Sequence, residues 1–594
     1  MDSSKKNKQL ESIRHSAEHI LTQAMQRLYP DKFIMAMGPA IDTGFYFDFE
    51  TINDFKVSEN DFPEIEKEMT KIVKESLPIT KEEISLDEAK KLFKNNPYKL
   101  EWLESIKNRK EKITIYKTGD EFIDLCSGPH LDNTKNIPAF KLLSVAGAYW
   151  HGDENNKMLT RIYGTAFENS KELRKYLNNL EEAKKRNHKK IGKELDLFCF
   201  SDLVGPGLPM FTPKGTIIIE ELKKHIENVC RAYGFEKVMT PHLSKIKLYE
   251  ISGHAKKFGQ ELFHVTSSRN HDLVLKPVQC PHQTQIYASQ LRSYRDLPIR
   301  YMESEKQYRA EKGGEVGGLN RVYAITVEDG HSFCRVDQVK EEVINMVKII
   351  KEFYTALGLW GSHWVSLSLR DYDHPEKYIG ESKDWDTCEQ MLEEIAKEMN
   401  LDAKKCEGEA ALYGPKLDFM FKDALGNEIQ IPTVQLDFAT PKKFDLKYTD
   451  KDGSEKAPVM VHRAVLGSYE RFLALIIEHF AGAFPIWLSP IQVKIVPISD
   501  KHLDYAQKIE KELKDQNVRV EIDNKSETMQ NKIRNATTQK IPYILILGDK
   551  EVASSDQQVS VRQRDGQNIG TMPIKDFIKK VSQQISKKSL SLIK

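Results

Sequence analysis

Residues that can bind phosphate and metal ions surround a glycine-rich turn in segment 308–334, YRAEKGGEVGGLNRVYAITVEDGHSFC. Two extended stretches joined by such a turn predict an antiparallel hairpin. On one face of that hairpin, the guanidinium groups of Arg309 and Arg321 would suit a polyphosphate. Glu311 and Glu328 could receive a nucleobase amine or a magnesium ion. The alternative is a charged surface hairpin with cross-strand salt bridges, and composition does not separate the two.

A second group of candidate residues lies nearer the N-terminus. The apolar residues of 12–28 recur at helical spacing and form one stripe. His15 and His19, four residues apart, fall together on the opposite, polar face. The sequence DLCSGPH then offers Cys126 and His130 from a turn after a strand. Two such pairs have the donor set of a four-ligand metal site.

Periodicity predicts the elements that must position these residues. Segment 53–110 is rich in Lys and Glu with an amphipathic helical pattern, whereas 112–167 has the aromatic and β-branched runs of strands. The charged stretch 168–194 is typical of a linker helix. Further patterns predict helices at 216–233 and 336–357 and strands at 322–327, 416–422 and 428–437. From 491 onward, strands alternate with helices, which predicts a small α/β domain with an apolar parallel sheet.

Length and composition bound the class of protein. A chain of 594 residues is too long for one core and predicts three or four domains. No run of about 18 apolar residues and no secretory signal is found, so a cytoplasmic protein is expected. The seven scattered cysteines fit a reducing compartment. With a net charge of +1, any nucleic-acid surface must be local.

The hairpin resembles motif 2 of the class II aminoacyl-tRNA synthetases, in which an Arg-x-Glu opens a hairpin over ATP. YRAE, the glycine-rich loop, RVYAI and VED carry this match. The segment VHRAVLGSYERFLALIIEHFAGAFPIWLSP resembles motif 3, with Arg471 in the Glu-Arg pair that begins a helix beneath the nucleotide. Pro241 stands where motif 1 carries its dimer-interface proline, so the resemblance implies a homodimer. Three motifs in the right order make the match specific.

Within that class, KPVQCPHQTQIY, EDGHSFC, LYGPKLDF, TVQLDF and MVHRAVLGSYERF resemble the threonyl-tRNA synthetase family, and the resemblance covers nearly the whole chain. In that family a cysteine and two histidines hold a catalytic zinc ion. The matching positions are Cys280, His331 and His462. Local spacing would instead pair Cys280 with His282, or His331 with Cys334.

A zinc ion bound by these three residues would help to select threonine. Three protein ligands leave coordination positions open, which the α-amine and β-hydroxyl of threonine can fill. Valine has almost the same shape but no hydroxyl, and a hydrophobic pocket separates such isosteres only about 100-fold. Serine has both groups, so it is expected to be activated. A second, hydrolytic sieve is therefore required.

The resemblance implies roles for residues from every part of the chain. An editing pocket that hydrolyses seryl-tRNA, with an unassigned histidine as base, is implied at His15, His19, Asp124, Cys126 and His130. The phosphates in the catalytic step are expected near Arg309, Arg321, Lys416 and Arg471, with Mg²⁺ on ATP. Nucleotide binding is expected at Arg309, Glu311, Arg321, Glu328, Gln430, Thr433 and Arg471. Threonine is expected at Asp329, Tyr413 and Gln435. The anticodon is expected at Arg534, Glu551 and Arg562, for which surface salt bridges are the alternative.

Several positions depart from the family pattern. His282 stands where glycine is expected, and Ile325 stands where motif 2 offers a phenylalanine to adenine. Val327 replaces a glutamine near the threonine site, and Ser526 replaces an asparagine of the anticodon domain. The chain is also expected to lack the small N-terminal domain of many members. These departures predict weaker ATP affinity or altered anticodon preference.

The predicted fold is a multidomain α/β and α+β architecture. It comprises an α+β editing domain at 1–170 with a helical insertion at 53–110, a linker helix at 171–194, a class II antiparallel-sheet catalytic domain at 195–488 and an α/β anticodon-binding domain at 489–594. The predicted function is ATP-dependent ligation of L-threonine to tRNA(Thr) through a threonyl-adenylate, with editing of seryl-tRNA. The alternatives are a non-catalytic synthetase-like protein that binds tRNA or regulates, and a stand-alone seryl-tRNA deacylase. The complete set of catalytic motifs disfavours the deacylase.

Overall fold

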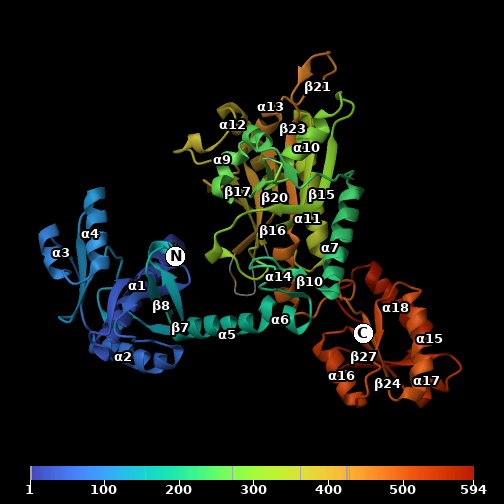
Figure 1. Cartoon of the computed structure of the whole chain (residues 1–594), viewed down its shortest axis with the longest axis horizontal. Helices are drawn as coiled ribbons and strands as arrows, with labels where there is room; N and C mark the ends of the chain where they lie inside the picture. The colour runs from blue at the N-terminus through green and yellow to red at the C-terminus, as the bar shows by residue number, and fades with distance from the viewer. Residues whose placement is uncertain are drawn as a thin grey trace. The chain divides into compact units, whose positions relative to one another are not determined.

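The computed structural model describes residues 3–153, 155–269, 272–361, 363–422, 426 and 428–593 (Figure 1). The chain divides into two compact units, Met1–Glu181 and Glu182–Lys594. The expected single linker helix is two helices, α5 (Ser170–Arg186) and α6 (His188–Glu194). Asn187 separates them, because its side chain accepts a hydrogen bond from the Lys189 N–H and caps α6. The division into four domains remains a prediction.

The first unit packs a long helix, α1 (Ser3–Leu28), on an antiparallel sheet. The sheet has the order β1-β3-β8-β7, with β2 paired to β3; these strands are β1 (Phe33–Met37), β2 (Ala40–Ile41), β3 (Gly44–Thr51), β7 (Ala139–Tyr149) and β8 (Met158–Phe167). Ala17, Ile20 and Leu21 of the apolar stripe of α1 are fully buried against this sheet. The helix predicted at 12–28 is confirmed, and it begins nine residues earlier, at Ser3.

The lysine- and glutamate-rich insertion is helical with one exception. Its helices are α2 (Phe62–Glu75), α3 (Leu86–Leu92) and α4 (Pro97–Arg109). Between them lies a strand, β4 (Ile79–Glu83), which pairs with β5 (Thr114–Thr118), itself paired with β6 (Phe122–Leu125). Only Ile79 of β4 is buried. An edge strand with this many charged residues carries little of the apolar alternation that would identify it in the sequence.

The second unit is built on an eight-stranded sheet with the order β11-β15-β16-β23-β20-β19-β17-β18. Its strands are β11 (Glu236–Lys237), β15 (Ile299–Tyr308), β16 (Ala324–Cys334), β17 (His363–Leu369), β18 (Ala403–Glu407), β19 (Lys416–Lys422), β20 (Glu428–Asp437) and β23 (Val459–Ser468). The outermost pair at each edge is parallel and all inner pairs are antiparallel. Strands β19 and β20 have the predicted bounds, while the strand predicted at 322–327 continues to Cys334.

Helices cover one face of this sheet (Figure 1). They are α7 (Pro213–Ala232), α11 (Val339–Ala356), α12 (Ser382–Glu398) and α14 (Tyr469–Phe480). Leu417, Val434 and Val461 of the sheet pack beneath them in the largest hydrophobic core of the described residues. The residues that alternate with these three along the strands therefore project from the other face.

A mixed sheet forms the C-terminal part of the second unit. Strands β24 (Val493–Pro497), β25 (Val520–Ile522) and β26 (Tyr543–Leu547) are parallel, as predicted, with α15 (Leu503–Lys514) and α16 (Met529–Thr538) between them. The expectation of an entirely parallel sheet is wrong, because β27 (Gln558–Gln563) and β28 (Asn568–Pro573) join antiparallel, followed by α18 (Ile574–Ser586). The residues of β27 alternate between buried and partly exposed, the pattern of a strand covered on one face. Among the residues that the structure describes, no helix has both the length and the apolar composition that a membrane span requires.

Candidate active site and metal centre

Four polar side chains line up across the open face of the eight-stranded sheet. His331 of β16 lies opposite His462 of β23, His462 lies opposite Gln435 of β20, and Gln435 lies opposite Lys416 of β19. Directly opposed residues point to the same face of a sheet. This face is the one turned away from α7 and α11, so the four side chains form the floor of a polar site.

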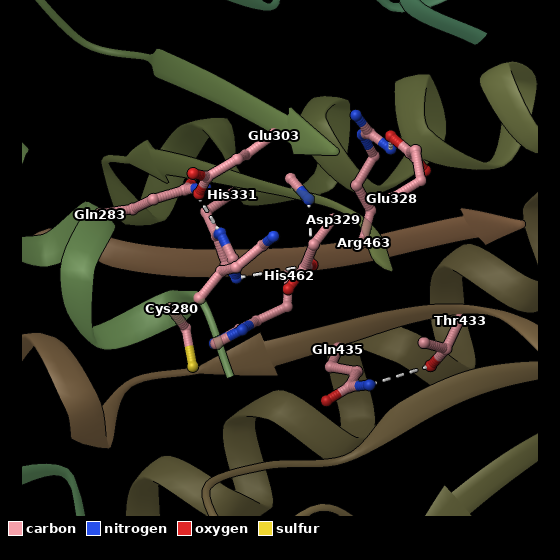
Figure 2. Close-up of polar contacts among 12 residues, drawn as sticks. Cys280, Gln283, Glu303, Glu328, Asp329, His331, Thr433, Gln435, His462 and Arg463 are labelled. Atoms are coloured by element: carbon pink, nitrogen blue, oxygen red, sulfur yellow. Dashed lines mark hydrogen bonds and ion pairs between the residues drawn. The ribbon is translucent and has the colours of Figure 1, made fainter. Parts of the chain in front are cut away.

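A cysteine and two histidines converge at one end of this row (Figure 2). Helix α10 (Cys280–Ala288) begins at Cys280, and the thiol meets the imidazoles of His331 and His462. One potential ligand atom from each residue lies within 4.8 Å of the other two, and all three residues are buried. The two imidazole rings are 4.7 Å apart and nearly perpendicular, at 83°. The three positions that the family resemblance indicated are therefore brought together.

Each imidazole has one nitrogen committed to an outer partner and one free. Nδ1 of His331 donates to the Gln283 side-chain oxygen at 2.7 Å, and Nε2 is buried without a hydrogen-bond partner. Nε2 of His462 donates to a carboxylate oxygen of the fully buried Asp437 at 2.9 Å, which leaves Nδ1 free. A fixed tautomer with one available lone pair is what a metal-binding histidine requires. A thiolate and two neutral imidazoles suit zinc, so the residues present fit that ion.

Burial favours the uncharged forms of Cys280 and His331. It raises the pKa of the Cys280 thiol well above its ordinary value and lowers the pKa of His331 well below its ordinary value. Asp329, two residues before His331 on the same face, lies with a carboxylate oxygen 3.7 Å from Nε2 of His331. Burial, followed by the charge of Glu328, raises the pKa of Asp329 to about 7. A cation or an ammonium group at this place would stabilise the carboxylate.

The residues expected to contact threonine surround the cysteine–histidine cluster. The Tyr413 hydroxyl donates to the Gln435 side-chain oxygen at 2.8 Å, and the Tyr413 ring stacks on His462 at 4.5 Å. The Gln435 side-chain nitrogen donates to the Thr433 hydroxyl at 3.3 Å (Figure 2). Together with Asp329, these side chains lie beside the candidate metal ligands.

The hairpin arginines lie just beyond the last paired residues of β15 and β16, Tyr308 and Ala324. Arg309 is half-buried, with its guanidinium 5.0 Å from the centre of the Phe258 ring. Arg321 is exposed and forms ion pairs with Glu311 at 2.8 Å and with Glu315 at 3.1 Å. Arg321 thus forms the salt bridges that the surface-hairpin alternative predicted.

The expectation that Glu328 contacts the nucleotide is not supported, because Glu328 faces the other side of the sheet. It is buried, and it accepts hydrogen bonds from the Arg463 guanidinium at 2.5 Å and from the Val465 N–H at 3.1 Å (Figure 2). Adjacent residues of a strand point to opposite faces, so Glu328 and Asp329 cannot both line the site. Glu328 instead forms a buried ion pair beneath it.

Lys416 and Gln430 both contact the carboxylate of Asp418, a residue that was not predicted from the sequence. The ammonium of Lys416 lies 2.8 Å from Asp418, and the Gln430 side-chain nitrogen donates to the same carboxylate at 2.7 Å. Arg471 lies exposed in the first turn of α14, and its pKa is lowered first by partial desolvation and then by the positive charge of Arg321. Arg321 and Arg471 are thus two exposed cations that act on each other electrostatically.

The N-terminal candidates form a second cluster. Helix α1 supplies His15 and His19, and the turn after β6 supplies Cys126 and His130, with all four potential ligand atoms within 4.8 Å of one another. The Cys126 sulfur lies 3.4 Å from Nε2 of His15 and 3.2 Å from Nε2 of His130. The histidine face of α1 is not a solvent face, because His19 is 1% exposed and packs under the turn. His15 and Cys126 open onto a cavity of about 340 Å³, which Asp124 also lines.

The charges of this cluster are suppressed. Burial lowers the pKa of His15 to about 4 and that of His130 to about 2, and it raises the pKa of Cys126 to about 12. Asp124 instead keeps a buried partner, the Lys99 ammonium at 2.6 Å. Neutral imidazoles can either accept a proton from water or coordinate a metal ion, so the geometry fits both of the uses considered from the sequence.

Sequence reasoning missed several residues that act on the candidates. A signal existed for Asp418 and Asp437, since an acid inside an apolar strand must find a partner. No local signal marks the partners that lie on helices. These residues are Gln283, beside His331; Lys99, beside Asp124; and His254, whose Nε2 is 4.0 Å from the Cys280 sulfur. The pairs suggested by local spacing are wrong, because His282 faces Tyr249 and Cys334 is buried in the hydrophobic core.

The expected anticodon residues lie on three elements of the C-terminal part. Arg534 is exposed on α16, and Arg562 is half-buried on β27. Glu551 lies in α17 (Asp549–Val552), where its carboxylate accepts a hydrogen bond from the Gly548 N–H at 2.9 Å. The cap gives Glu551 a local structural role, and anticodon contact remains a prediction for all three. Of the departing positions, Ile325 and Val327 are half-buried on β16 and Ser526 is exposed.

Comparisons with known protein families match three parts of the chain. Residues 263–480 match the class II tRNA synthetase core domain (G, H, P, S and T), and residues 492–584 match an anticodon-binding domain. Residues 113–163 match the threonyl and alanyl tRNA synthetase second additional domain. The first match contains the cysteine–histidine cluster, and the third contains Cys126 and His130.

Relatives that match nearly the whole chain fall in the same class of protein. The chain is 45% identical to the threonine--tRNA ligase of Cytophaga hutchinsonii, over 96% of this chain and 88% of that protein. It is 46% identical to that of Staphylococcus carnosus, over 96% and 87%. Among solved structures, it is similar to the RNA binding domain of threonyl-tRNA synthetase from Cryptosporidium parvum, with a TM-score of 0.63 and 33% identity over 67% of this chain and 98% of that one. A prolyl-tRNA synthetase from Giardia lamblia, 18% identical, shares the fold at a TM-score of 0.53, with 68% of this chain and 80% of that chain covered.

We expect Gln283→Ala to weaken zinc binding by about 10- to 100-fold, the usual effect of removing an outer partner of a metal ligand. Without the amide oxygen, nothing holds the Nδ1 proton and ring orientation of His331. Chelator competition on the purified protein measures this affinity. Gln285→Ala, on an exposed position of the same helix, is the control. Equal affinity in both variants would contradict the role of Gln283.

Proposed function

Because this chain belongs to the threonine--tRNA ligase family, we propose that Cys280, His331 and His462 hold the zinc ion with which it selects threonine. The family joins L-threonine to tRNA(Thr) in an ATP-dependent reaction, and the non-catalytic alternative is not favoured. The observation that carries the proposal is the convergence of the three ligands, each histidine with one nitrogen free. A bound zinc ion would supply a Lewis acid with open positions for an amine and a hydroxyl.

The neighbouring side chains would orient the amino acid. The carboxylate of Asp329, close to the free nitrogen of His331, is suited to the α-ammonium group. Tyr413 and Gln435, joined by a hydrogen bond, form a wall that limits the size of the side chain. Valine would leave buried polar groups unpaired, and such groups cost about 1–3 kcal/mol each. Serine would satisfy them, which makes a hydrolytic site necessary.

The basic residues would hold ATP for attack by the threonine carboxylate on the α-phosphate. Arg309 and Arg321 flank the loop of the hairpin, and Arg471 lies in the first turn of α14. Arg321 would exchange its ion pair with Glu311 for a phosphate, while Lys416 stays directed by Asp418. Mg²⁺ bound with ATP would share the phosphate charge. Positioned positive charge is the main catalytic contribution in such a reaction.

We expect His462→Ala to lose both zinc and threonine-dependent pyrophosphate exchange. Loss of a ligand should exceed the roughly 10- to 100-fold effect of losing an outer partner. Metal analysis and the exchange assay measure the two losses on the same preparation. His479→Ala, an exposed histidine of α14, is the control. Full activity in the metal-free variant would reject the metal role.

The first unit would remove serine from mischarged tRNA. The match of residues 113–163 to the second additional domain and the cavity beside His15 and Cys126 support this use of the cluster. The low pKa values of His15 and His130 keep these imidazoles neutral at neutral pH, so each retains a lone pair that can orient the attacking water. Asp124, held by Lys99, would orient the seryl ester at the wall of the cavity.

We expect the double variant His15→Ala with His19→Ala to threonylate tRNA normally but to accumulate seryl-tRNA. Loss of the base should slow deacylation by about 100-fold or more, since general base catalysis contributes 10²–10⁴-fold. Aminoacylation with serine measures the accumulation. His151→Ala, an exposed histidine of the same unit, is the control. Unchanged serine mischarging would remove the editing assignment, and metal retained by the wild-type cluster would favour the four-ligand alternative.

The partner surfaces are also proposals. Arg534, Glu551 and Arg562 would read the anticodon from the range matched by the anticodon-binding domain. The matched ranges support an editing domain at 1–170, a linker at 171–194, a catalytic domain at 195–488 and an anticodon-binding domain at 489–594. A homodimer would bury the surface around Pro241, where Met239 is 77% exposed and Leu243 is 41% exposed.

We expect Met239→Asp to weaken dimerisation, because the charge would be buried without a partner. Such a charge costs about 3 kcal/mol, or roughly 100-fold in affinity. Light scattering over a range of concentrations measures the shift from dimer to monomer. Met158→Asp is the matched control, since Met158 is 58% exposed and lies in the other unit. A monomeric wild-type protein, or equal behaviour of the two variants, would contradict the proposed interface.

A further inference from the structure

His188 is a buried histidine that the proposed chemistry does not use. It begins α6, in the sequence HKKIGKE, where only His188, Ile191 and Gly192 are buried. Its side chain is 3% exposed, although the surrounding sequence is strongly basic. A polar ring that is removed from water needs partners on both of its nitrogens.

The ring of His188 bridges two segments that are far apart in the sequence. Nδ1 donates to a carboxylate oxygen of Glu478 at 2.7 Å, and the backbone N–H of His188 donates to the same oxygen at 3.2 Å. On the other side, Nε2 accepts a hydrogen bond from the backbone N–H of Leu319 at 3.2 Å. The Leu319 N–H can only donate, so Nε2 carries a lone pair and the proton is on Nδ1. One tautomer satisfies both bonds.

Both partners of His188 belong to segments that carry a candidate ATP arginine. Leu319 lies in the hairpin loop, two residues before Arg321. Glu478 lies in α14, seven residues after Arg471 and therefore two turns along the same side of the helix. The charge of Arg321 also acts on Arg471, which agrees with this arrangement of the two segments. The imidazole is thus a fixed spacer between the two segments.

The loop is shaped to fit the ring. A Cβ on Gly318 would lie 2.4 Å from Nε2 of His188, and Gly318 has a φ of +56°, in the left-handed region. Both features require glycine at this position. Leu319 is fully buried in the same hydrophobic core as Ile191 of α6. The backbone before Arg321 is therefore pressed against His188 rather than free in solvent.

We propose that His188 is a positioning residue for ATP. By holding the Leu319 backbone and the Glu478 carboxylate at a fixed separation, it presents Arg321 and Arg471 to the same phosphates before ATP binds. The inference rests on the proposed function only for the roles of the two arginines. Its energetic basis is preorganisation. Because the loop is already ordered before the nucleotide arrives, binding loses less conformational entropy.

Three substitutions separate positioning from simple packing. His188→Ala removes both side-chain bonds and should raise the KM for ATP in pyrophosphate exchange by about 10- to 100-fold, up to about 10-fold for each hydrogen bond lost. The KM for threonine and the zinc content should change little. The melting temperature should be close to those of the other two His188 variants. His188→Gln can place its side-chain oxygen at the former position of Nε2, where it can accept the Leu319 N–H, and should recover most of the ATP affinity. His188→Asn can place only an N–H donor at the former position of Nδ1, toward Glu478, and should not recover it.

The outcomes are distinct. A KM for ATP that rises alone and is rescued by Gln but not by Asn supports the proposal. Equal rises for ATP and threonine, or equal behaviour of the Gln and Asn variants, overturn it, because the ring would then only fill space. Direct binding of ATP by calorimetry repeats the comparison without turnover. If the wild-type protein fails to activate threonine, the proposed function fails, whereas the calorimetric ranking of the variants still decides the role of His188.

Discussion

The direct pairing of His331 with His462 across β16 and β23 is the constraint on which the rest of the active site depends. It places two imidazoles on one face, at a separation fixed by the backbone ladder. The same ladder continues to Gln435 and Lys416, so the residues proposed to select the amino acid and to contact phosphate lie on one face of a single sheet. Of the three candidate ligands, only Cys280 comes from outside the sheet. It lies at the start of α10, and the next turn of that helix supplies Gln283.

Side chains alternate between the two faces of a strand, so the charged residues of β16 and β23 lie on opposite sides of the sheet. Asp329 and His331 lie on the face of the proposed active site, whereas Glu328 and Arg463 form an ion pair in the layer between the sheet and the helices. A buried pair of this kind is costly to desolvate, and removing one partner leaves an uncompensated charge. The ion pair therefore ties β16 to β23 directly beneath the pairing that holds the candidate ligands.

The two clusters are built from similar residues. Each combines a cysteine with histidines, and burial disfavours the charged forms of His331 in one and of His130 in the other. In the catalytic cluster, Gln283 and Asp437 fix the tautomers, so lone pairs converge on one point. In the N-terminal cluster, Nδ1 of His130 lies 3.3 Å from the Ser16 hydroxyl, whereas both nitrogens of His19 lack a hydrogen-bond partner. The catalytic cluster therefore has an outer partner on each histidine, and the N-terminal cluster does not.

The sequence by itself determined the elements and the chemistry that they carry. Periodicity gave the bounds of β19 and β20 and the existence of α1, and the motif residues gave the three candidate ligands, because these signals are local or match a family pattern residue by residue. It could not determine that Glu328 faces away, that Gln283 and Lys99 support the sites, or that His188 meets Leu319. Those facts depend on strand register and on contacts between distant segments, which arise only when hydrophobic burial fixes one packing of the whole chain.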